Sequence, residues 1–384
     1  MPTHTITHIM LHTVALPYVE PLKTSFGVEA DKAAVLVELT LENGVTGWGE
    51  SAVEIRPGYG AETVFTALHV LNNFLIPKLV GRPLTSPLDA AALLRSVREH
   101  HHTKSGLEAA VWDAWAKTEG KRLTDLFAEH ATPPTESRGC AHVGVSIGIQ
   151  PTIEATLAII RKRLEQGYNR IKLKITPGWD VELARAVRAE YPDINLMLDA
   201  NSAYTLADAA HLKQLDEFRL MMIEQPLGYD DIYEHAALQA QLRTPICLDE
   251  SVKSVSDLHL ALQLDACRIL NLKPPRVGGF TASLAIYEVC VRKGVPLWIG
   301  GLLETGVGRA ANLALAALSG VTLPCDISAT DRYFAPDIVE PPFTISANST
   351  ITVPGGSGIG VEVQPDRLEA AEAHWSRIVP YVEA

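Results

Sequence analysis

The stretches 196–199, 221–224 and 246–249 read Leu-Met-Leu-Asp, Met-Met-Ile-Glu and Ile-Cys-Leu-Asp. Each is an apolar run that ends in a carboxylate, and successive carboxylates are 25 residues apart (224 − 199 and 249 − 224). One strand, loop and helix of a (β/α) barrel occupies about this length of chain. Because the carboxyl ends of the parallel barrel strands surround one pocket, the spacing predicts a barrel with three carboxylates in a shared pocket.

The three carboxylates, Asp199, Glu224 and Asp249, would repel one another in such a pocket unless positive charge lay between them. Carboxylate oxygens are the ligands that Mg²⁺ prefers, and this ion keeps coordination positions for water or substrate. A single Asp at a strand end more often caps a helix than binds a metal. Three carboxylates in the same register favour a metal site, so we predict bound Mg²⁺, with Mn²⁺ or Co²⁺ as possible substitutes.

Lysines flank the carboxylates in the same register. Lys172 and Lys174 lie in the preceding apolar segment, and Lys273 lies 24 residues after Asp249 (273 − 249). A single lysine is more often a surface residue. Charged residues at the ends of five successive apolar segments are better explained by one functional site than by coincidence.

The composition narrows the class of partner. The chain has 384 residues, and 45 acidic against 33 basic residues give a net charge of −12. This charge argues against nucleic acid or an anionic membrane as the main partner, so we expect a small-molecule substrate. We find no secretory signal and no apolar stretch of membrane-spanning length, which predicts a cytoplasmic protein. The five cysteines are odd in number and have no metal-site spacing, as expected for free thiols.

The first unit, residues 1–135, does not show the spacing of about 25 residues between apolar segments. Alternating apolar residues over 35–41, followed by Asn43-Gly44, predict an antiparallel hairpin with a tight turn. Helical patterns at 61–71 and 107–118 make this unit α+β. Two loops, Pro21–Glu29 centred on Phe26 and Glu54–Gly60, are expected to close over a substrate.

The second unit, residues 136–334, carries the period throughout. Strands are expected at 143–147, 170–175, 196–200, 220–224, 245–249, 268–273, 296–300 and 321–325. Thr152 and Gly167 mark the two ends of the first intervening helix, and Thr205–Asp208 resembles a capping box. An eight-stranded barrel is therefore predicted.

The C-terminal tail, residues 335–384, loses the period again and alternates like antiparallel strands at 344–346 and 350–353. Chain ends often lie close together in a domain, so we expect the tail to return to the first unit. The two pieces would then form a cap over the barrel mouth.

The strand-end residues resemble those of the enolase superfamily, and specifically its muconate-lactonising-enzyme subgroup. The matching features are Lys172-Leu173-Lys174, the three carboxylates and Lys273 on the sixth strand. The seventh strand lacks the His of mandelate racemase relatives, and 323–328 lacks the Asp-x-Asp of dipeptide epimerases. The resemblance covers the whole chain. It implies an α/β fold with a TIM-like (β/α)₇β barrel and an α+β capping domain formed from the N-terminal third and the C-terminal tail.

Two longer stretches are similar to the o-succinylbenzoate synthase and N-acylamino acid racemase family. They are 273–279, Lys-Pro-Pro-Arg-Val-Gly-Gly, and 300–312, Gly-Gly-Leu-Leu-Glu-Thr-Gly-Val-Gly-Arg-Ala-Ala-Asn. Pro275 replaces a glycine that is usual in the family, but this change removes no catalytic group.

The resemblance implies a role for each site residue. Lys174 and Lys273 are the acid/base pair on opposite faces of the substrate α-carbon, and Lys172 assists Lys174. The metal stabilises the enediolate that forms when a proton next to a carboxylate is removed, as is established for the superfamily. The remaining expected site residues orient the ligands or line the substrate pocket: Asn201, Glu250, Arg276, Ser146, Gly301, Leu303 and Phe26.

Two products can follow from one enediolate. Loss of a β-hydroxyl gives o-succinylbenzoate, whereas return of a proton to the opposite face racemises an N-acylamino acid. In the family, an arginine three residues after the sixth-strand lysine accompanies racemase activity, and Arg276 holds that place, so we favour a homo-oligomeric enzyme with both activities. The alternative is the synthase activity alone. Muconate cycloisomerisation is disfavoured because residues 300–312 are similar to the o-succinylbenzoate synthase and N-acylamino acid racemase family. A non-catalytic binding scaffold is disfavoured because the set of metal ligands and bases is complete.

Overall fold

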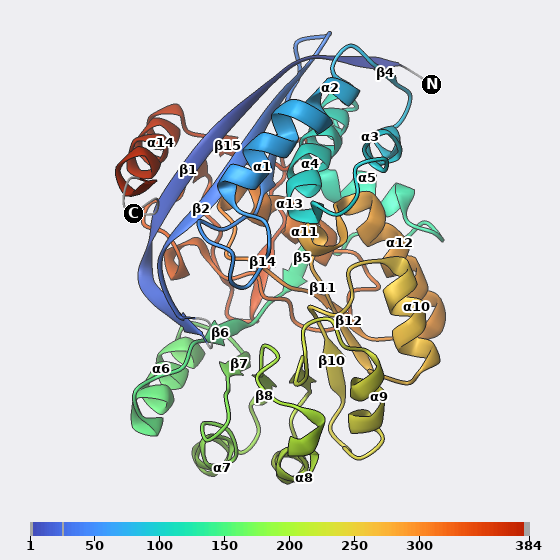
Figure 1. Ribbon diagram of the computed structural model, residues 1–384. Coiled ribbons are helices and arrows are strands. Elements are labelled where there is room, and N and C mark those ends of the chain that lie inside the picture. The colour runs from blue at the N-terminus through green and yellow to red at the C-terminus, as the bar shows by residue number, and fades with distance from the viewer. Residues whose placement is uncertain (1–2, 25–26, 380–384) are drawn as a thin grey trace.

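The computed structural model describes residues 3–24 and 27–379, so Phe26 lies outside the described residues. An antiparallel sheet with its helices lies over one end of a curled parallel sheet (Figure 1). Within the described ranges, no helix combines the length and the apolar character that a membrane span requires.

The curled sheet has seven parallel strands in the order β12-β11-β10-β9-β8-β7-β6, which confirms the predicted barrel architecture. The strands are β6 (Val145–Ile147), β7 (Arg170–Lys174), β8 (Asn195–Asp199), β9 (Ile223–Glu224), β10 (Ile246–Leu248), β11 (Ile269–Leu272) and β12 (Leu297–Ile299). Their residues are mostly buried and apolar, as expected for parallel strands covered on both faces.

The predicted eighth strand, 321–325, is wrong as a regular strand. Its backbone nevertheless bonds at both edges of the sheet: Asp326 N, directly after the segment, donates to Ile299 O in β12 (2.9 Å), and Cys325 O accepts from Gly144 N (2.8 Å), which directly precedes β6. The proline in this segment has no N–H to give to a ladder, which prevents continuous strand pairing. The segment therefore closes the ring through single hydrogen bonds.

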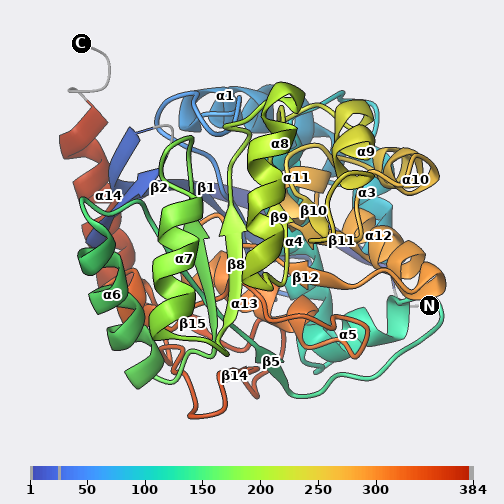
Figure 2. The same cartoon turned by 90° about the horizontal axis from the view of Figure 1, so that it is seen from below.

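Helices surround the parallel strands, as the view from below shows (Figure 2). They are α6 (Ile153–Glu165), α7 (Val181–Glu190), α8 (Ala209–Leu212), α9 (Tyr233–Gln239), α10 (Val255–Gln263), α12 (Phe280–Lys293) and α13 (Gly306–Ala316). The predicted helix starts are confirmed, because the Thr152 side chain accepts from Ala155 N and Thr205 forms a capping box with Asp208.

The antiparallel sheet of the cap has the strand order β3-β2-β1-β4. Its strands are β1 (His4–Thr24), β2 (Gly27–Leu41), β3 (Thr46–Ser51) and β4 (Pro83–Leu84). The predicted hairpin is confirmed, and Gly44 at its turn has a positive φ of 82°. The predicted loop Pro21–Glu29 is wrong, because Leu22 pairs with Glu29 and extends the β1–β2 ladder.

The cap also contains several helices and receives the C-terminal helix. The helices are α1 (Val64–Val70), the π-helix η1 (Leu71–Leu75), α2 (Ile76–Leu79), α3 (Leu88–Leu94), α4 (His101–Thr118) and α5 (Leu123–His130). Helix α14 (Pro365–Ile378) lies against β1 (Figure 1), where Glu372 Oε1 is 2.8 Å from His12 Nδ1.

Strand β3 lies directly on helix α4 because both elements carry glycine at the contact. A Cβ atom at Gly106 would overlap Ser51 N, and one at Gly49 would overlap Gly106 O. Helix α4 also places Glu108 at the start of α12, since Thr281 N donates to Glu108 Oε1 (3.0 Å). The close contact between β3 and α4 thus connects the cap sheet to the barrel.

We expect the substitution Gly106→Ala to lower the free energy of unfolding by about 2 kcal/mol, the range typical of an overpacked contact. In an exposed helix the same substitution would stabilise by roughly 0.5–1 kcal/mol, so the sign of the change identifies the cause. Urea unfolding followed by circular dichroism measures this change. Gly355→Ala is the control, because no atom lies within 4 Å of a Cβ built there. Equal stability of the two variants would contradict the explanation.

Candidate active site

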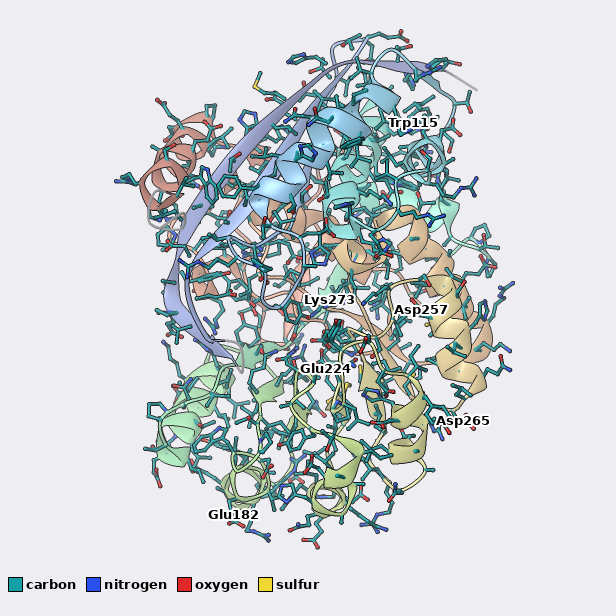
Figure 3. The ribbon with its side chains drawn as sticks, viewed as in Figure 1. Trp115, Glu182, Glu224, Asp257, Asp265 and Lys273 are labelled. Carbon is teal, nitrogen blue, oxygen red and sulfur yellow. The ribbon has the colours of Figure 1, made fainter. Side chains whose placement is uncertain are left out.

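A cavity lies between the carboxyl ends of the barrel strands and the cap. The cap contributes Glu29, Glu54 and Tyr59 to its lining, and the barrel contributes Ser146, Lys172, Lys174, Asn201, Lys273, Gly301, Leu302, Leu303, Asp326, Arg332 and Tyr333. Figure 3 shows Glu224 and Lys273 in the interior between the two units, whereas Glu182 and Asp265 lie on the outside of the barrel. Most residues predicted for the site therefore meet around one cavity.

The three predicted metal ligands form a row at the ends of β8, β9 and β10. Asp199 pairs in register with Glu224, and Glu224 pairs with Cys247, two residues before Asp249. All three carboxylates are almost fully buried. Lys172 Nζ lies 3.2 Å from Asp199 Oδ2 and 3.1 Å from Glu224 Oε2, so two of the carboxylates share one ammonium group.

The donor set fits a hard divalent cation. Each carboxylate is paired with a lysine or arginine side chain, and among the described residues no three ligand-type side chains converge on one point. Burial, followed by repulsion from Asp199, raises the pKa of Glu224 above its usual value, so the surrounding cations do not fully compensate the buried negative charge. Oδ1 of Asp249 is buried and lies in an ion pair with Arg276, but it accepts no hydrogen bond within the described part of the chain. Oxygen donors of this kind suit Mg²⁺.

A lysine lies at each end of the row of carboxylates. Lys174 Nζ, at the end of β7, donates to Asp199 Oδ2 (2.7 Å) and to Asn201 Oδ1 (2.5 Å). Lys273 Nζ, which follows β11, donates to Asp249 Oδ2 (2.7 Å) and to the Tyr59 hydroxyl (2.6 Å). Three strands separate β7 from β11, so the two ammonium groups face the cavity from different sides.

Asn201 and Glu250 are joined to the row by hydrogen bonds. Asn201 N donates to Asp199 Oδ1 (3.0 Å), and Asn201 Nδ2 donates to Glu250 Oε1 (3.0 Å). Asn201 has a positive φ of 40°, a conformation that asparagine tolerates better than most residues. Through these bonds Asn201 fixes the positions of Asp199 and Lys174 relative to Glu250.

Arg276 is buried beside the opposite end of the row. Helix α11 (Pro274–Val277) starts directly after Lys273 and turns the Arg276 side chain back, so that its Nε lies 3.2 Å from Asp249 Oδ1. Its Nη2 also donates to the Tyr59 hydroxyl. Burial opposes the ionised form of Asp249, but Arg276 and then Lys273 hold the pKa of that carboxyl below its usual range.

The structure adds four site residues that the sequence analysis did not predict: Tyr59, Asn271, Asp326 and Arg332. Tyr59 belongs to the predicted closing loop Glu54–Gly60, and its hydroxyl donates to Asp249 Oδ2 (3.0 Å). Asn271 Nδ2 donates to Glu224 Oε1 (2.7 Å), and Asp326 lies 2.5 Å from Lys172 Nζ.

Two of these residues had a usable signal in the sequence. Asp326 follows the eighth apolar segment in the same way as the metal ligands follow theirs. Asn271 lies near the end of β11, and Lys273 follows two residues later in the same extended conformation, which places both side chains on the same face. Ser146, Gly301 and Leu303 line the cavity.

Comparison with known proteins identifies the family. Residues 6–128 match the N-terminal domain of the mandelate racemase and muconate lactonizing enzyme family, and residues 155–367 match its enolase C-terminal domain-like part. The chain belongs to this family. This assignment confirms the predicted superfamily membership and the predicted barrel with a cap.

Several proteins similar to this enolase-superfamily chain are named after the reaction that they catalyse. An o-succinylbenzoate synthase of Geobacillus kaustophilus is 46% identical over 95% of both chains. An N-succinylamino acid racemase of Thermus thermophilus is 44% identical over 96% of this chain and 97% of its own. A solved structure of an enolase-superfamily member from Enterococcus faecalis superposes with a TM-score of 0.89 at 41% identity, over 96% of this chain and 98% of the other.

The family assignment has consequences for the site. The chain is an enzyme with a small-molecule substrate, and enzymes of this family depend on a metal ion. A muconate lactonizing enzyme of Pseudomonas fluorescens shares the fold, with a TM-score of 0.88, but is only 24% identical. This likeness shows the common fold alone.

Proposed function

We propose that the enzyme removes the proton next to a substrate carboxylate and returns it to either face, racemising N-succinylamino acids, and that it also forms o-succinylbenzoate by dehydration. The observation that carries this proposal is the row Lys174, Asp199, Glu224, Asp249 and Lys273, in which a lysine stands at each end of three carboxylates. Relatives with 42–46% identity bear both activity names, which supports a dual function.

In this mechanism the protein residues hold the metal and move the proton. Asp199, Glu224 and Asp249 would hold Mg²⁺, which would supply positive charge to the substrate carboxylate as negative charge develops there. Lys174 takes the α-proton from one face, and Lys273 gives a proton to the other face in racemisation. In dehydration Lys174 carries out both proton transfers, and Lys273 contributes positive charge only.

Lys172 lines the cavity and assists the reaction. Its ammonium lies within 3.2 Å of Asp199, Glu224 and Asp326. Burial lowers its basicity, but Asp326, Glu224 and Asp199 together raise the pKa of Lys172 above the usual value. Lys172 therefore stays protonated and serves as a fixed positive charge for Lys174 and the substrate carboxylate.

The proposal is tested by measuring kcat/KM for the racemisation of N-succinylamino acids and for dehydration to o-succinylbenzoate on one preparation. Both reactions are expected to proceed. Dehydration without racemisation would support the alternative of a synthase alone. If the α-proton of neither substrate exchanges with deuterated water, α-proton abstraction is refuted. Turnover of muconate would favour the cycloisomerase alternative.

Arg276 gives a prediction about the balance between the two reactions. Arg276→Gln removes the charge beside Asp249 and frees the Tyr59 hydroxyl from one of its donors, and so changes the surroundings of Lys273. Racemisation is expected to fall roughly 10- to 100-fold, as for other changes beside a catalytic group. Dehydration falls much less, because it needs only the charge of Lys273. The ratio of the two kcat/KM values is the measurement.

The control for this prediction is Arg268→Gln, at the other end of β11, where the side chain is half exposed and pairs with Asp265. This variant should leave the ratio unchanged. Equal losses of both activities in Arg276→Gln would mean that Arg276 supports folding or substrate binding in general.

The predicted cytoplasmic location, the homo-oligomer and the division into units at residues 135 and 334 stay predictions. All five cysteines are free, which agrees with a reducing compartment. Light scattering coupled to gel filtration measures the oligomeric state. Limited proteolysis tests whether cleavage falls near residue 135.

A further inference from the structure

One wall of the cavity carries positive charge that the protein only partly neutralises. Arg332 ends the short helix η4 (Thr330–Arg332) and lines the cavity together with Ser146. The side chain is only 8% exposed. Its Nη2 donates to Ser146 O (3.3 Å), whereas its Nε makes no hydrogen bond to any residue that the structure describes.

The acidic partner of Arg332 is shared with two other cations. Glu20, on β1, lies 2.6 Å from Arg163 Nη2 and 2.9 Å from Lys162 Nζ, but 3.7 Å from Arg332 Nη1. Lys162 is more than half exposed, so water screens its charge. Arg163 and Arg332 are both buried, and together they have one carboxylate between them, which lies closer to Arg163.

The shortage of carboxylates beside these two arginines affects the pKa of Arg163. Burial, followed by repulsion from Arg332, lowers the pKa of Arg163. Asp326, a carboxylate that lines the cavity, is already paired with Arg170 (2.6 Å) and Lys172 (2.5 Å). Within the described ranges, Glu20 is the only carboxylate in ion-pair contact with Arg332.

Ser146 presents a second polar group without a partner on the same wall. Its Oγ is buried and makes no hydrogen bond in the part of the chain that the structure describes. A buried hydroxyl without a partner costs free energy that a ligand can recover. An anion that accepts hydrogen bonds would satisfy both Ser146 Oγ and Arg332 Nε.

We propose that Arg332, assisted by Ser146, binds a second carboxylate of the substrate, the one carried by a succinyl group, and so makes the enzyme selective for dicarboxylic acyl groups. This inference rests on the proposed function. A planar carboxylate matches the Nε and Nη edge of a guanidinium through two parallel hydrogen bonds. N-Succinylamino acids and the precursor of o-succinylbenzoate both carry a succinyl carboxylate, so one arginine serves both reactions.

The test compares two substrates that differ only in this carboxylate, an N-succinylamino acid and the N-acetyl derivative of the same amino acid. Wild-type enzyme prefers the succinyl substrate. In Arg332→Gln the ratio of the two kcat/KM values is expected to fall roughly 10- to 100-fold, as for a lost hydrogen bond to a charged group, mainly through the KM of the succinyl substrate. Arg332→Lys, which keeps the charge, restores part of the ratio.

Two further variants separate binding from structure. Arg163→Gln is the matched control, since Arg163 shares Glu20 but does not line the cavity, and its ratio should equal that of wild type. Glu20→Gln removes the competing carboxylate and is expected to keep or raise the ratio. A fall in Glu20→Gln as large as that in Arg332→Gln would overturn the inference, because it would show that the ion pair acts through folding.

The remaining outcomes distinguish this inference from the proposed function. Equal losses for both substrates in Arg332→Gln, or a wild-type enzyme without preference for the succinyl group, would overturn the role of Arg332 and leave the proposed function intact. Calorimetric binding of N-succinylglycine and N-acetylglycine to the Mg²⁺-loaded protein gives a readout that does not depend on turnover. If neither acylamino acid is racemised but the succinyl ligand binds more tightly in wild type than in Arg332→Gln, the inference stands and the proposed racemisation fails.

Discussion

Replacing Lys273 with alanine is expected to reduce racemisation roughly 10³- to 10⁴-fold, the upper part of the range for general acid–base catalysis. One face of the α-carbon then has no group to deliver or remove a proton. Lys174→Ala is expected to abolish dehydration as well as racemisation, because Lys174 carries out both proton transfers in dehydration. Chiral chromatography measures racemisation, and the absorbance of the aromatic product measures dehydration.

Deuterium exchange separates the two lysines further. In Lys273→Ala, the enantiomer whose α-proton faces Lys174 should still exchange that proton with deuterated solvent, and the other enantiomer should not. Lys174→Ala should show the opposite pattern. Lys213→Ala, an exposed lysine on η3 (Lys213–Phe218), is the control and should keep both activities. Unimpaired racemisation by either of the two cavity variants would show that the bases have been assigned wrongly.

Removal of the metal is expected to stop both reactions, and Mg²⁺ is expected to restore them. The Asp249→Asn variant should lose activity roughly 10³-fold or more, because one of three anionic ligands is gone and Arg276 and Lys273 lose their buried counter-charge. Turnover after chelator treatment, and with Mg²⁺ added back, measures both effects. Asp265→Asn is the control, since that carboxylate lies on the surface (Figure 3).

A stability measurement belongs with this prediction. Asp249 is almost fully buried among cations, so Asn at this position could reduce activity by unfolding the protein. Circular dichroism should show that Asp249→Asn is folded. Calorimetry should show that it binds Mg²⁺ more weakly than wild type. Full turnover by chelator-treated enzyme would refute the metal assignment.

The barrel was predictable because its information is local and repeated. A charged residue stands at the end of five successive buried apolar runs, and the interval of 25 residues between carboxylates holds even where the strand is as short as β9 (Ile223–Glu224). The eighth segment failed as a strand because the proline within 321–325 interrupts backbone pairing, a local effect that the apolar pattern does not reveal.

The unpredicted parts of the site depend on contacts between distant parts of the chain. Tyr59 reaches Asp249 across 190 residues of sequence, and nothing near Tyr59 indicates a partner. The position of Arg332 beside Ser146 likewise follows from ring closure and not from a motif. Strand β1 was not predicted, because its polar and apolar residues alternate weakly and it contains proline.

The Tyr59 hydroxyl joins the cap to Lys273 and Arg276 in the barrel, and this contact limits how such enzymes can be recombined. A chimera that takes its first 135 residues from a relative brings a new residue to position 59 while keeping the old one at 276. If the incoming residue lacks a hydroxyl, Lys273 and Arg276 each lose one acceptor in a buried place. Exchanges of the cap between relatives should therefore succeed only when the residues at positions 59 and 276 come from the same parent protein.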